Sequence, residues 1–501
     1  MEQEIIGVGD LRAVAAAAYD HGQNSLLAMF ANDERTLNGN FAIYCIFSLS
    51  QKPYFKVVKA ELPDSAAPEF PSLVPVISAA AWYEREIHDL FGLTPVGHPD
   101  LRPLVLHENW PHNQYPLRKD FDVHTPVPVV SDEYKMEYVH GKGVFEVPVG
   151  PIHAGIIEPG HFRFSQAGEN TIHLDAKLFF THRGIEKAVE GLTIDKAFYQ
   201  AERICGACTV SHALSYSQAV EAMAGVTVSD RARYLRVITA ELERLYNHVG
   251  DIGNLCAGLG FAVGVSNGAR LKEELMRLNE MVAGNRFLRG MVVPGGTAFD
   301  ITADIAQEIL SLLREIETDF SEVLELLREN DAFLDRVNRT GILPRQAVVD
   351  LSVVGVAARA SGVDKDIRRD APYAAYSDMN FKVPVYTSGD VAARLWVRAD
   401  ETVQSVRILR QALSRLPVGV LKVEIPAIQP YSCGFGWSES ARGSNVHWLM
   451  IGENNTIYRY FVRSASYANW PAVTVADPGN IIPDFPLINK SFELCYACID
   501  R

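Results

Sequence analysis

Short apolar runs dominate the first hundred residues, and a helical period replaces them further along the chain. Residues 41–50 (FAIYCIFSLS) and 54–63 (YFKVVKAELP) are apolar runs of the length and composition typical of strands. Residues 76–93 (VISAAAWYEREIHDLFGL) carry apolar positions at helical spacing, and this helix should end near Gly92. We therefore expect a small α+β domain over residues 1–121.

The chain then becomes polar and rich in proline, with too few apolar positions to build a core. Residues 122–143 are accordingly predicted to be a linker. Two strand-like runs follow it, residues 145–155 (FEVPVGPIHAG) and 161–180 (HFRFSQAGENTIHLDAKLFF). Together these runs predict a β-hairpin that precedes the helical part of the chain.

From residue 185 to residue 413 the apolar positions recur every three to four residues. Residues 231–256 and 304–338 show this most clearly and predict long amphipathic helices. The last part of the chain again contains strand-like runs, such as residues 455–467. The predicted fold class is α+β, with a second, mainly helical domain over residues 144–501 that starts with the hairpin and ends with a small β part.

Composition and charge exclude several classes of protein. The chain has 501 residues and a formal net charge of -14, without a run rich in lysine or arginine, so nucleic acid is not an expected partner. The first residues, MEQEIIGVGD, are acidic where a signal peptide is basic, and no apolar stretch reaches the roughly 20 residues of a membrane span. We expect a cytoplasmic protein without direct membrane insertion.

The seven cysteines carry the candidate chemistry. Four of them form two Cys-x-x-Cys pairs, one in ERICGACTVSH and one in LCYACIDR at the end of the sequence. An odd number of cysteines without a secretory signal argues against a disulfide framework. One pair alone could be buried or redox-active, but two pairs favour four thiolates on a soft metal such as nickel or iron, with zinc as the alternative. The four residues are Cys205, Cys208, Cys495 and Cys498.

Both cysteine motifs resemble the signatures of nickel–iron (NiFe) hydrogenase large subunits, in particular those of the membrane-associated, energy-converting group of formate hydrogenlyase type. Residues 42–121, with YEREIHDLFG and YPLRKDF, resemble the 30 kDa subunit of respiratory complex I. Residues 144–501, with GPIHAG, THRGIEK, ELERLYNHVGDIG and ESARG, resemble its 49 kDa subunit, which lacks the paired cysteines and binds quinone. The resemblance covers nearly the whole chain and implies a hydrogenase catalytic subunit.

The resemblance also implies ligands and catalytic residues. Cys205, Cys208, Cys495 and Cys498 would bind nickel (Ni), and the second cysteine of each pair would bridge to an iron (Fe) that carries CO and CN ligands. Glu158 matches the glutamate that takes a proton from Cys495. The alternative, judged from its neighbours alone, is that a glutamate before proline caps a turn.

Three further positions match residues of these families. Arg442 matches an arginine that donates to an iron-bound cyanide, although a turn arginine is often only ion-paired. Glu186 matches a ligand of an accessory magnesium (Mg) or iron ion, and Arg501 replaces the histidine that completes that site. His153 matches a histidine that contacts a quinone cofactor, with a structural histidine as the alternative. Hydrogenase large subunits usually lose a C-terminal extension after a basic residue, and the sequence ends at Arg501.

The expected activity is reversible proton reduction and dihydrogen oxidation at a Ni-Fe centre. No cysteine set remains for an iron–sulfur cluster, so an iron–sulfur small subunit similar to the complex I 20 kDa subunit is an expected partner. A ferredoxin-like subunit and membrane-arm subunits would complete the complex and hold this chain at the inner face of the membrane. The alternatives are a quinone-binding or coupling subunit of an NADH:quinone oxidoreductase without a working Ni-Fe site, and a structural assembly protein stapled by zinc.

Overall fold

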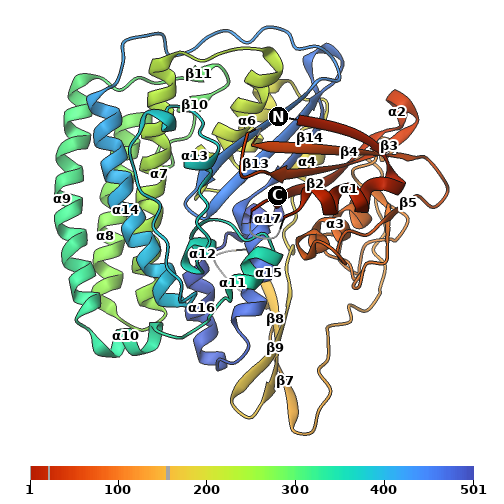
Figure 1. Ribbon diagram of the computed structural model, residues 1–501, viewed down its shortest axis with the longest axis horizontal. Coiled ribbons are helices and arrows are strands. Elements are labelled where there is room, and N and C mark those ends of the chain that lie inside the picture. Colours follow the sequence, from red (N-terminus) through yellow and green to blue (C-terminus); the bar gives the residue numbers. More distant parts are fainter. Residues whose placement is uncertain (1, 21–22, 53, 154–157) are drawn as a thin grey trace. The chain divides into compact units, whose positions relative to one another are not determined.

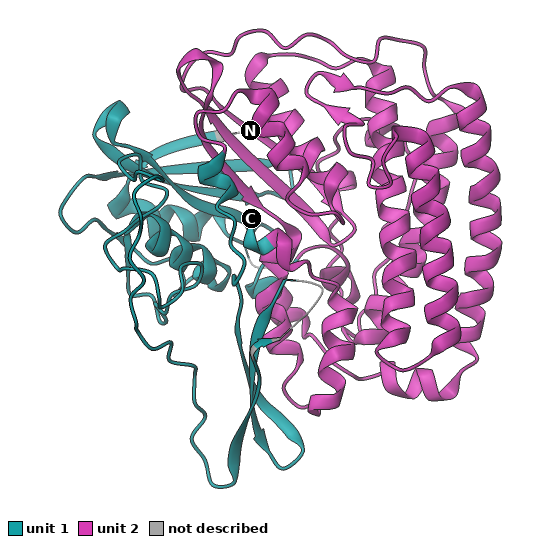
Figure 2. Cartoon of the chain, turned by 180° about the vertical axis from the view of Figure 1, so that it is seen from behind, with its two compact units in different colours: residues 1–188, 349–353, 499–501 teal, residues 189–348, 354–498 magenta. Residues whose placement is uncertain are grey.

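The computed structural model describes residues 2–20, 23–52, 54–153 and 158–501, which form two compact units (Figure 2). Unit 1 comprises residues 1–188, 349–353 and 499–501, and unit 2 comprises residues 189–348 and 354–498.

A four-stranded sheet forms the core of unit 1. Its strands are β1 (Glu2–Gly7), β2 (Ser25–Glu34), β3 (Asn40–Ser48) and β4 (Phe55–Pro63), in the order β1-β4-β3-β2, with β1 and β4 parallel and the other pairs antiparallel. Almost every residue of β2 and β3 is buried, because helix α3 (Ala81–Phe91) packs against β2. The α3 helix ends at Gly92, whose φ of 67° is left-handed, as the sequence predicts. The remaining elements of this region are α1 (Leu11–Ala18), α2 (Arg35–Asn38), β5 (Glu69–Pro71) and β6 (Thr94–Val96).

Residues 97–143 contain no helix or strand, which includes the predicted linker. A second sheet follows, with antiparallel strands β7 (Val144–His153), β8 (Gly160–Ala167) and β9 (Asn170–Lys177), before the short helix α4 (Ile185–Ala188). The predicted hairpin is confirmed as the antiparallel pair β7–β8, and β9 adds a third strand that the sequence did not predict. The run 161–180 contains two strands, because the chain turns at Gly168, which has a left-handed φ of 67°.

Unit 2 is built around a bundle of four long helices, α7, α8, α9 and α14 (Figure 1). The predicted helix 231–256 lies within α7, whereas the run 304–338 divides into two helices. The break occurs at Asn330, whose side chain accepts a hydrogen bond from the Phe333 amide and caps the second helix. The helices are α5 (Ile194–Glu202), α6 (Thr209–Ala224), α7 (Asp230–Ala257), α8 (Ala262–Ala283), α9 (Ala303–Arg328), α10 (Asp331–Val337), α11 (Arg345–Asp350), α12 (Gly355–Ala360), α13 (Ile367–Asp370), α14 (Val391–Ser414), α15 (Ala465–Ala476), α16 (Phe485–Phe492) and α17 (Tyr496–Asp500). No helix in the described ranges is both long and apolar enough to span a bilayer.

An antiparallel sheet, the predicted C-terminal β part, packs against α6. Its strands are β12 (Cys433–Ser440), β13 (Gly443–Ile451) and β14 (Ile457–Arg463). A separate two-stranded sheet pairs β10 (Val292–Val293) with β11 (Gly296–Thr297). Strand β12 approaches the α6 backbone so closely that a Cβ atom on Gly436 would overlap the carbonyl oxygen of Ser215. Glycine is therefore the residue that allows the sheet to cover this helix.

A buried ionic cluster joins the bundle to this sheet. Arg359 on α12 donates to Glu401 on α14 at 2.7 Å and to Glu439 on β12 at 2.8 Å. Arg368 on α13 donates to Glu241 on α7 at 3.0 Å. All five side chains are buried. Because each carboxylate has a guanidinium partner, the charges are compensated inside the unit.

Candidate metal centre

The first cysteine pair lies in the turn between α5 and α6. Cys208 is the residue before the first turn of α6, with a non-helical φ of -128°. The Ala207 amide donates to the sulfur of Cys205 at 3.1 Å, and the Thr209 hydroxyl donates to its carbonyl oxygen at 3.1 Å. These bonds hold the turn in a shape that keeps both thiols buried.

The second pair lies where α16 passes into α17. Glu493 adopts a left-handed conformation with φ 52°, which ends α16 and turns the chain toward Cys495. The Cys495 amide donates to the Ser466 hydroxyl at 2.9 Å, and the Ser464 hydroxyl donates to the Cys498 carbonyl at 3.1 Å. The start of α15 therefore fixes the position of this pair.

The two pairs meet in unit 2. The sulfur atoms of Cys205 and Cys495 are 3.3 Å apart, and those of Cys205, Cys495 and Cys498 all lie within 4.8 Å of one another. Hydrogen bonds with Cys205 and Cys498 lower the pKa of Cys208 well below that of a free thiol, and hydrogen bonds with the same two residues lower the pKa of Cys495. All seven cysteines of the chain are free thiols, so these four remain available as ligands.

Arg442, in the turn between β12 and β13, is placed beside these thiols by three partners. Its guanidinium donates to Asn247 at 2.5 Å, to Asp251 at 2.9 Å and to the carbonyl oxygen of Glu493 at 2.9 Å. Asp251 and then Cys208 raise the pKa of Arg442, so the charge is permanent. The structure therefore places Arg442 beside the cysteines. Its hydrogen bond to an iron-bound cyanide stays a prediction.

A cavity of about 270 Å³ opens next to Arg442. Its polar lining includes Asp251, Asn254, Lys272 and Glu493. Asn254 donates to the Glu493 carboxylate at 2.6 Å. Burial raises the pKa of Glu493 to about 7. Polar groups therefore line one side of the centre.

Several of these residues were not singled out from the sequence. Glu243, Asn247 and Asp251 are spaced four residues apart on α7, so they share one face of that helix. Glu243 accepts hydrogen bonds from the amides of Val210 at 2.6 Å and Ser211 at 3.1 Å, and burial raises its pKa to about 8. The sequence signal that could have identified these three residues is the spacing of polar side chains every four positions within a predicted helix.

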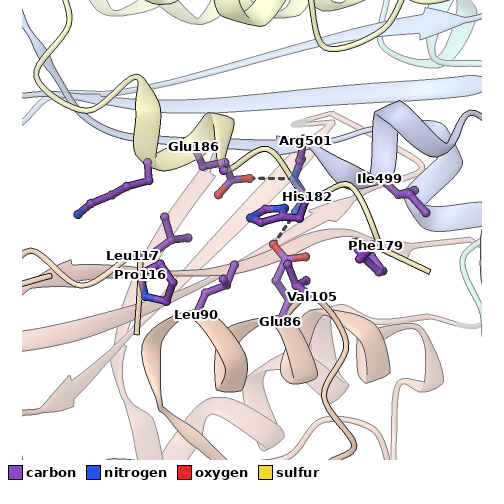
Figure 3. Close-up of a pocket in the computed structure, with 12 residues that line it drawn as sticks. Glu86, Leu90, Val105, Pro116, Leu117, Phe179, His182, Glu186, Ile499 and Arg501 are labelled. Atoms are coloured by element: carbon purple, nitrogen blue, oxygen red, sulfur yellow. Dashed lines mark hydrogen bonds and ion pairs between the residues drawn. The ribbon is translucent and has the colours of Figure 1, made fainter. Parts of the chain in front are cut away.

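Glu186, the predicted ligand of an accessory ion, lies in a different pocket, within unit 1 (Figure 3). Its carboxylate accepts from Arg501 at 2.9 Å, and the same guanidinium donates to Glu86 at 2.5 Å. His182 lies beside them, and burial followed by the charge of Arg501 lowers its pKa to about 4. A divalent ion would be repelled by the guanidinium that already neutralises Glu186. These residues therefore fit an ion pair and not an accessory magnesium ion.

The remaining predicted residues belong to unit 1. Glu158 is partly exposed and lies close enough to Asp500 to raise the pKa of that carboxyl, after the larger effect of burial. His153 is paired with Gly160 through the β7–β8 ladder, but its side chain lies outside the described residues. The roles of Glu158 in proton transfer and of His153 in cofactor binding stay predictions.

The residues of unit 2 fit a Ni-Fe cofactor by their chemistry. Four thiols, of which Cys205, Cys208 and Cys498 are buried and Cys495 is partly exposed, are soft donors for nickel or iron, and a permanent cation lies beside them. The same four sulfurs could also bind zinc, so the donor set alone does not select the metal.

Comparison with protein families agrees with the fused organisation. Residues 6–127 match the family described as respiratory-chain NADH dehydrogenase, 30 Kd subunit, and residues 259–434 match its 49 Kd subunit. Residues 183–257 match the family described as nickel-dependent hydrogenase. The last match contains the first cysteine pair and Glu186.

Relatives with the same organisation cover most of the chain. Hydrogenase-4 component G of Escherichia coli is 37% identical over 95% of this chain and 84% of its own length. Formate hydrogenlyase subunit 5 of the same organism is 36% identical with the same coverage, and an NADH-quinone oxidoreductase subunit of Phocaeicola vulgatus is 31% identical over 89% of each chain. The chain therefore belongs to the hydrogenase-related family in which regions similar to the 30 kDa and 49 kDa subunits of respiratory-chain NADH dehydrogenase are fused in one polypeptide.

Proposed function

We propose that this chain is the catalytic subunit of an energy-converting hydrogenase, which interconverts protons and dihydrogen at a Ni-Fe centre. The observation that carries the proposal is the convergence of two distant Cys-x-x-Cys pairs, with the sulfurs of Cys205 and Cys495 at 3.3 Å. Similarity to hydrogenase-4 component G and to formate hydrogenlyase subunit 5 over 95% of the chain supports it.

Each residue of the centre has a proposed part. Cys205, Cys208, Cys495 and Cys498 would hold the metals, and by the family resemblance Cys208 and Cys498 would be shared between nickel and iron. When bound, the nickel–iron group supplies the heterolytic cleavage or formation of dihydrogen. Arg442 keeps a fixed orientation through Asp251 and Asn247, so its charge and donors face the centre without rearrangement.

The proposed proton acceptor at the centre is the sulfur of Cys495. Hydrogen bonds from neighbouring thiols lower the pKa of Cys495 and favour its thiolate form, which has a lone pair that can take a proton. By the family resemblance, Glu158 receives this proton and passes it toward solvent. A carboxylate that is partly exposed, as Glu158 is, can exchange protons with water directly.

Electrons and membrane attachment are assigned to other subunits. We propose an iron–sulfur small subunit, a ferredoxin-like subunit and membrane-arm subunits as partners, and a cytoplasmic position against the inner face of the membrane. Relatives named as a component or a subunit of larger assemblies support this assignment.

The first experiment measures metals in the purified native complex. We expect nickel in stoichiometric amount with this chain, iron in excess of nickel because the partner subunits carry iron–sulfur clusters, and infrared bands of iron-bound CO and CN. Cys205→Ser should abolish nickel binding, whereas Cys433→Ser, which changes an exposed cysteine outside the cluster, should leave it intact. Stoichiometric zinc in place of nickel would overturn the proposal in favour of a zinc-stapled structural protein.

The second experiment measures hydrogen-dependent reduction of a dye by the same complex. The alternative function is a quinone-binding or coupling subunit, which the NADH-quinone oxidoreductase relative from Phocaeicola vulgatus favours. A complex that contains bound quinone, lacks nickel and does not reduce the dye with hydrogen would establish that alternative.

A further inference from the structure

A line of three buried side chains leads from the cysteine cluster into the C-terminal sheet. His212 on α6 has its Nε2 atom 3.7 Å from the sulfur of Cys498. Its Nδ1 atom is 2.9 Å from Nε2 of His447 on β13, and Nδ1 of His447 is 2.9 Å from the Tyr460 hydroxyl on β14. His212, His447 and Tyr460 are fully buried. The three contacts form one continuous hydrogen-bonded chain.

The sheet register determines why these side chains meet. His447 is paired with Val462 across the β13–β14 ladder, so Tyr460, two residues before Val462, is its diagonal neighbour on the same face. The rings of His447 and Tyr460 have centroids 5.5 Å apart, and those of His447 and His212 are 5.1 Å apart. The arrangement is therefore fixed by backbone pairing and by packing.

When Cys498 is a thiolate and both imidazoles are neutral, one direction of donation satisfies the whole chain. A thiolate accepts but cannot donate, so Nε2 of His212 must carry a hydrogen and Nδ1 of a neutral His212 must accept. His447 must then donate from Nε2 and accept at Nδ1 from the Tyr460 hydroxyl. Burial, followed by the neighbouring His212, lowers the pKa of His447 well below its usual range, so this ring is neutral and has one donor.

We propose that His447 and Tyr460 are positioning residues that fix His212 as a hydrogen-bond donor to the sulfur of Cys498. This inference rests on the proposed function, because the sulfur is an obligatory acceptor only as a metal-bound thiolate. Donation withdraws electron density from the shared sulfur and so weakens its donation to iron. His447 and Tyr460 thereby influence the electronic state of the centre without contacting it.

The test compares variants of the native complex by infrared spectroscopy. Tyr460→Phe and His447→Leu should both shift the iron-carbonyl band to lower wavenumber, because more electron density reaches iron when His212 no longer donates in a fixed direction. His447→Gln should return the band toward its wild-type position, since the amide can donate to His212 and accept from Tyr460. Thermal unfolding and nickel content are measured for each variant.

Tyr216→Phe is the matched control. Tyr216 is also buried, and its ring contacts that of Tyr460 with centroids 5.8 Å apart, but its hydroxyl donates to the Ile194 carbonyl at 2.8 Å. The iron-carbonyl band of Tyr216→Phe should stay at its wild-type position. Unshifted bands in nickel-loaded Tyr460→Phe and His447→Leu, or an equal shift in Tyr216→Phe, would overturn this inference alone. A wild-type complex without CO and CN bands would overturn the proposed function and this inference together.

Discussion

Arg501 lies between two buried carboxylates of unit 1, and its replacement by alanine tests how much that ion pair stabilises the unit. The guanidinium donates to Glu186 at 2.9 Å and to Glu86 at 2.5 Å, and all three side chains are at most 9% exposed. Arg501→Ala removes the positive charge and leaves both carboxylates without it.

The cost follows from desolvation. Removing one partner of a buried ion pair costs about 3–5 kcal/mol, because the remaining charge loses an interaction that water does not replace. The cavity beside the pair has a volume of about 30 Å³, and its lining includes Leu90, Leu117 and Phe179. It holds about two water molecules, too few to hydrate two carboxylates. We therefore expect Arg501→Ala to lower the free energy of unfolding by about 3–5 kcal/mol at pH 8. The loss should be smaller at pH 5, where the carboxylates can take up protons.

Differential scanning calorimetry of the full chain measures the effect. For a unit of about 200 residues, each kcal/mol changes the transition temperature by about 2–4 °C, so the transition of unit 1 should fall by roughly 6–20 °C. Lys56→Ala is the control in the same unit. Its ammonium lies 2.7 Å from Glu4, whose side chain is 40% exposed, so it should cost less than about 1 kcal/mol.

Two results would refute the reasoning about Arg501. A loss of less than about 1 kcal/mol in the free energy of unfolding of Arg501→Ala at pH 8 would show that other groups or water stabilise the two carboxylates. A loss equal at pH 5 and pH 8 would show that charge is not its cause. Magnesium chloride or EDTA should not change the stability of the wild-type chain, since the guanidinium takes the position of the accessory ion.

Three further predictions concern stability. Burial raises the pKa of Glu84 from 4.5 to about 7. Its contribution to the free energy of unfolding is therefore complete below pH 4.5 and is lost as the pH rises through 7. Glu84→Gln should remove about 3 kcal/mol of this pH dependence, which denaturant titration at several pH values measures. Gly436→Ala should cost about 1–3 kcal/mol in thermal unfolding, because the new methyl group overlaps the Ser215 carbonyl on α6. Arg359→Met should cost about 3–5 kcal/mol in the same assay, because the buried carboxylates of Glu401 and Glu439 both lose their ion pair with Arg359.

Local sequence determined the elements and the type of chemistry. The helix 76–93 ends at Gly92 as predicted, because the signal is a glycine that adopts a left-handed φ within the same few residues. Residues 122–143, which the sequence predicts to be a linker, lack helices and strands because their composition provides too few apolar positions to form a core. Two Cys-x-x-Cys spacings were sufficient to identify four candidate ligands, since three-residue spacing is a local property of a turn.

Tertiary structure decided which of these residues meet. The approach of Cys205 to Cys495 depends on α6 and α15 both packing against β13, which no local pattern encodes. The family resemblance places Arg501 where a histidine completes the site of Glu186, but only the packed structure shows that its guanidinium donates directly to the Glu186 carboxylate. Likewise, the register of β13 with β14 places Tyr460 beside His447. A sequence specifies donor types and local turns, whereas distances between donors are fixed only when the core packs and long-range pairs replace water.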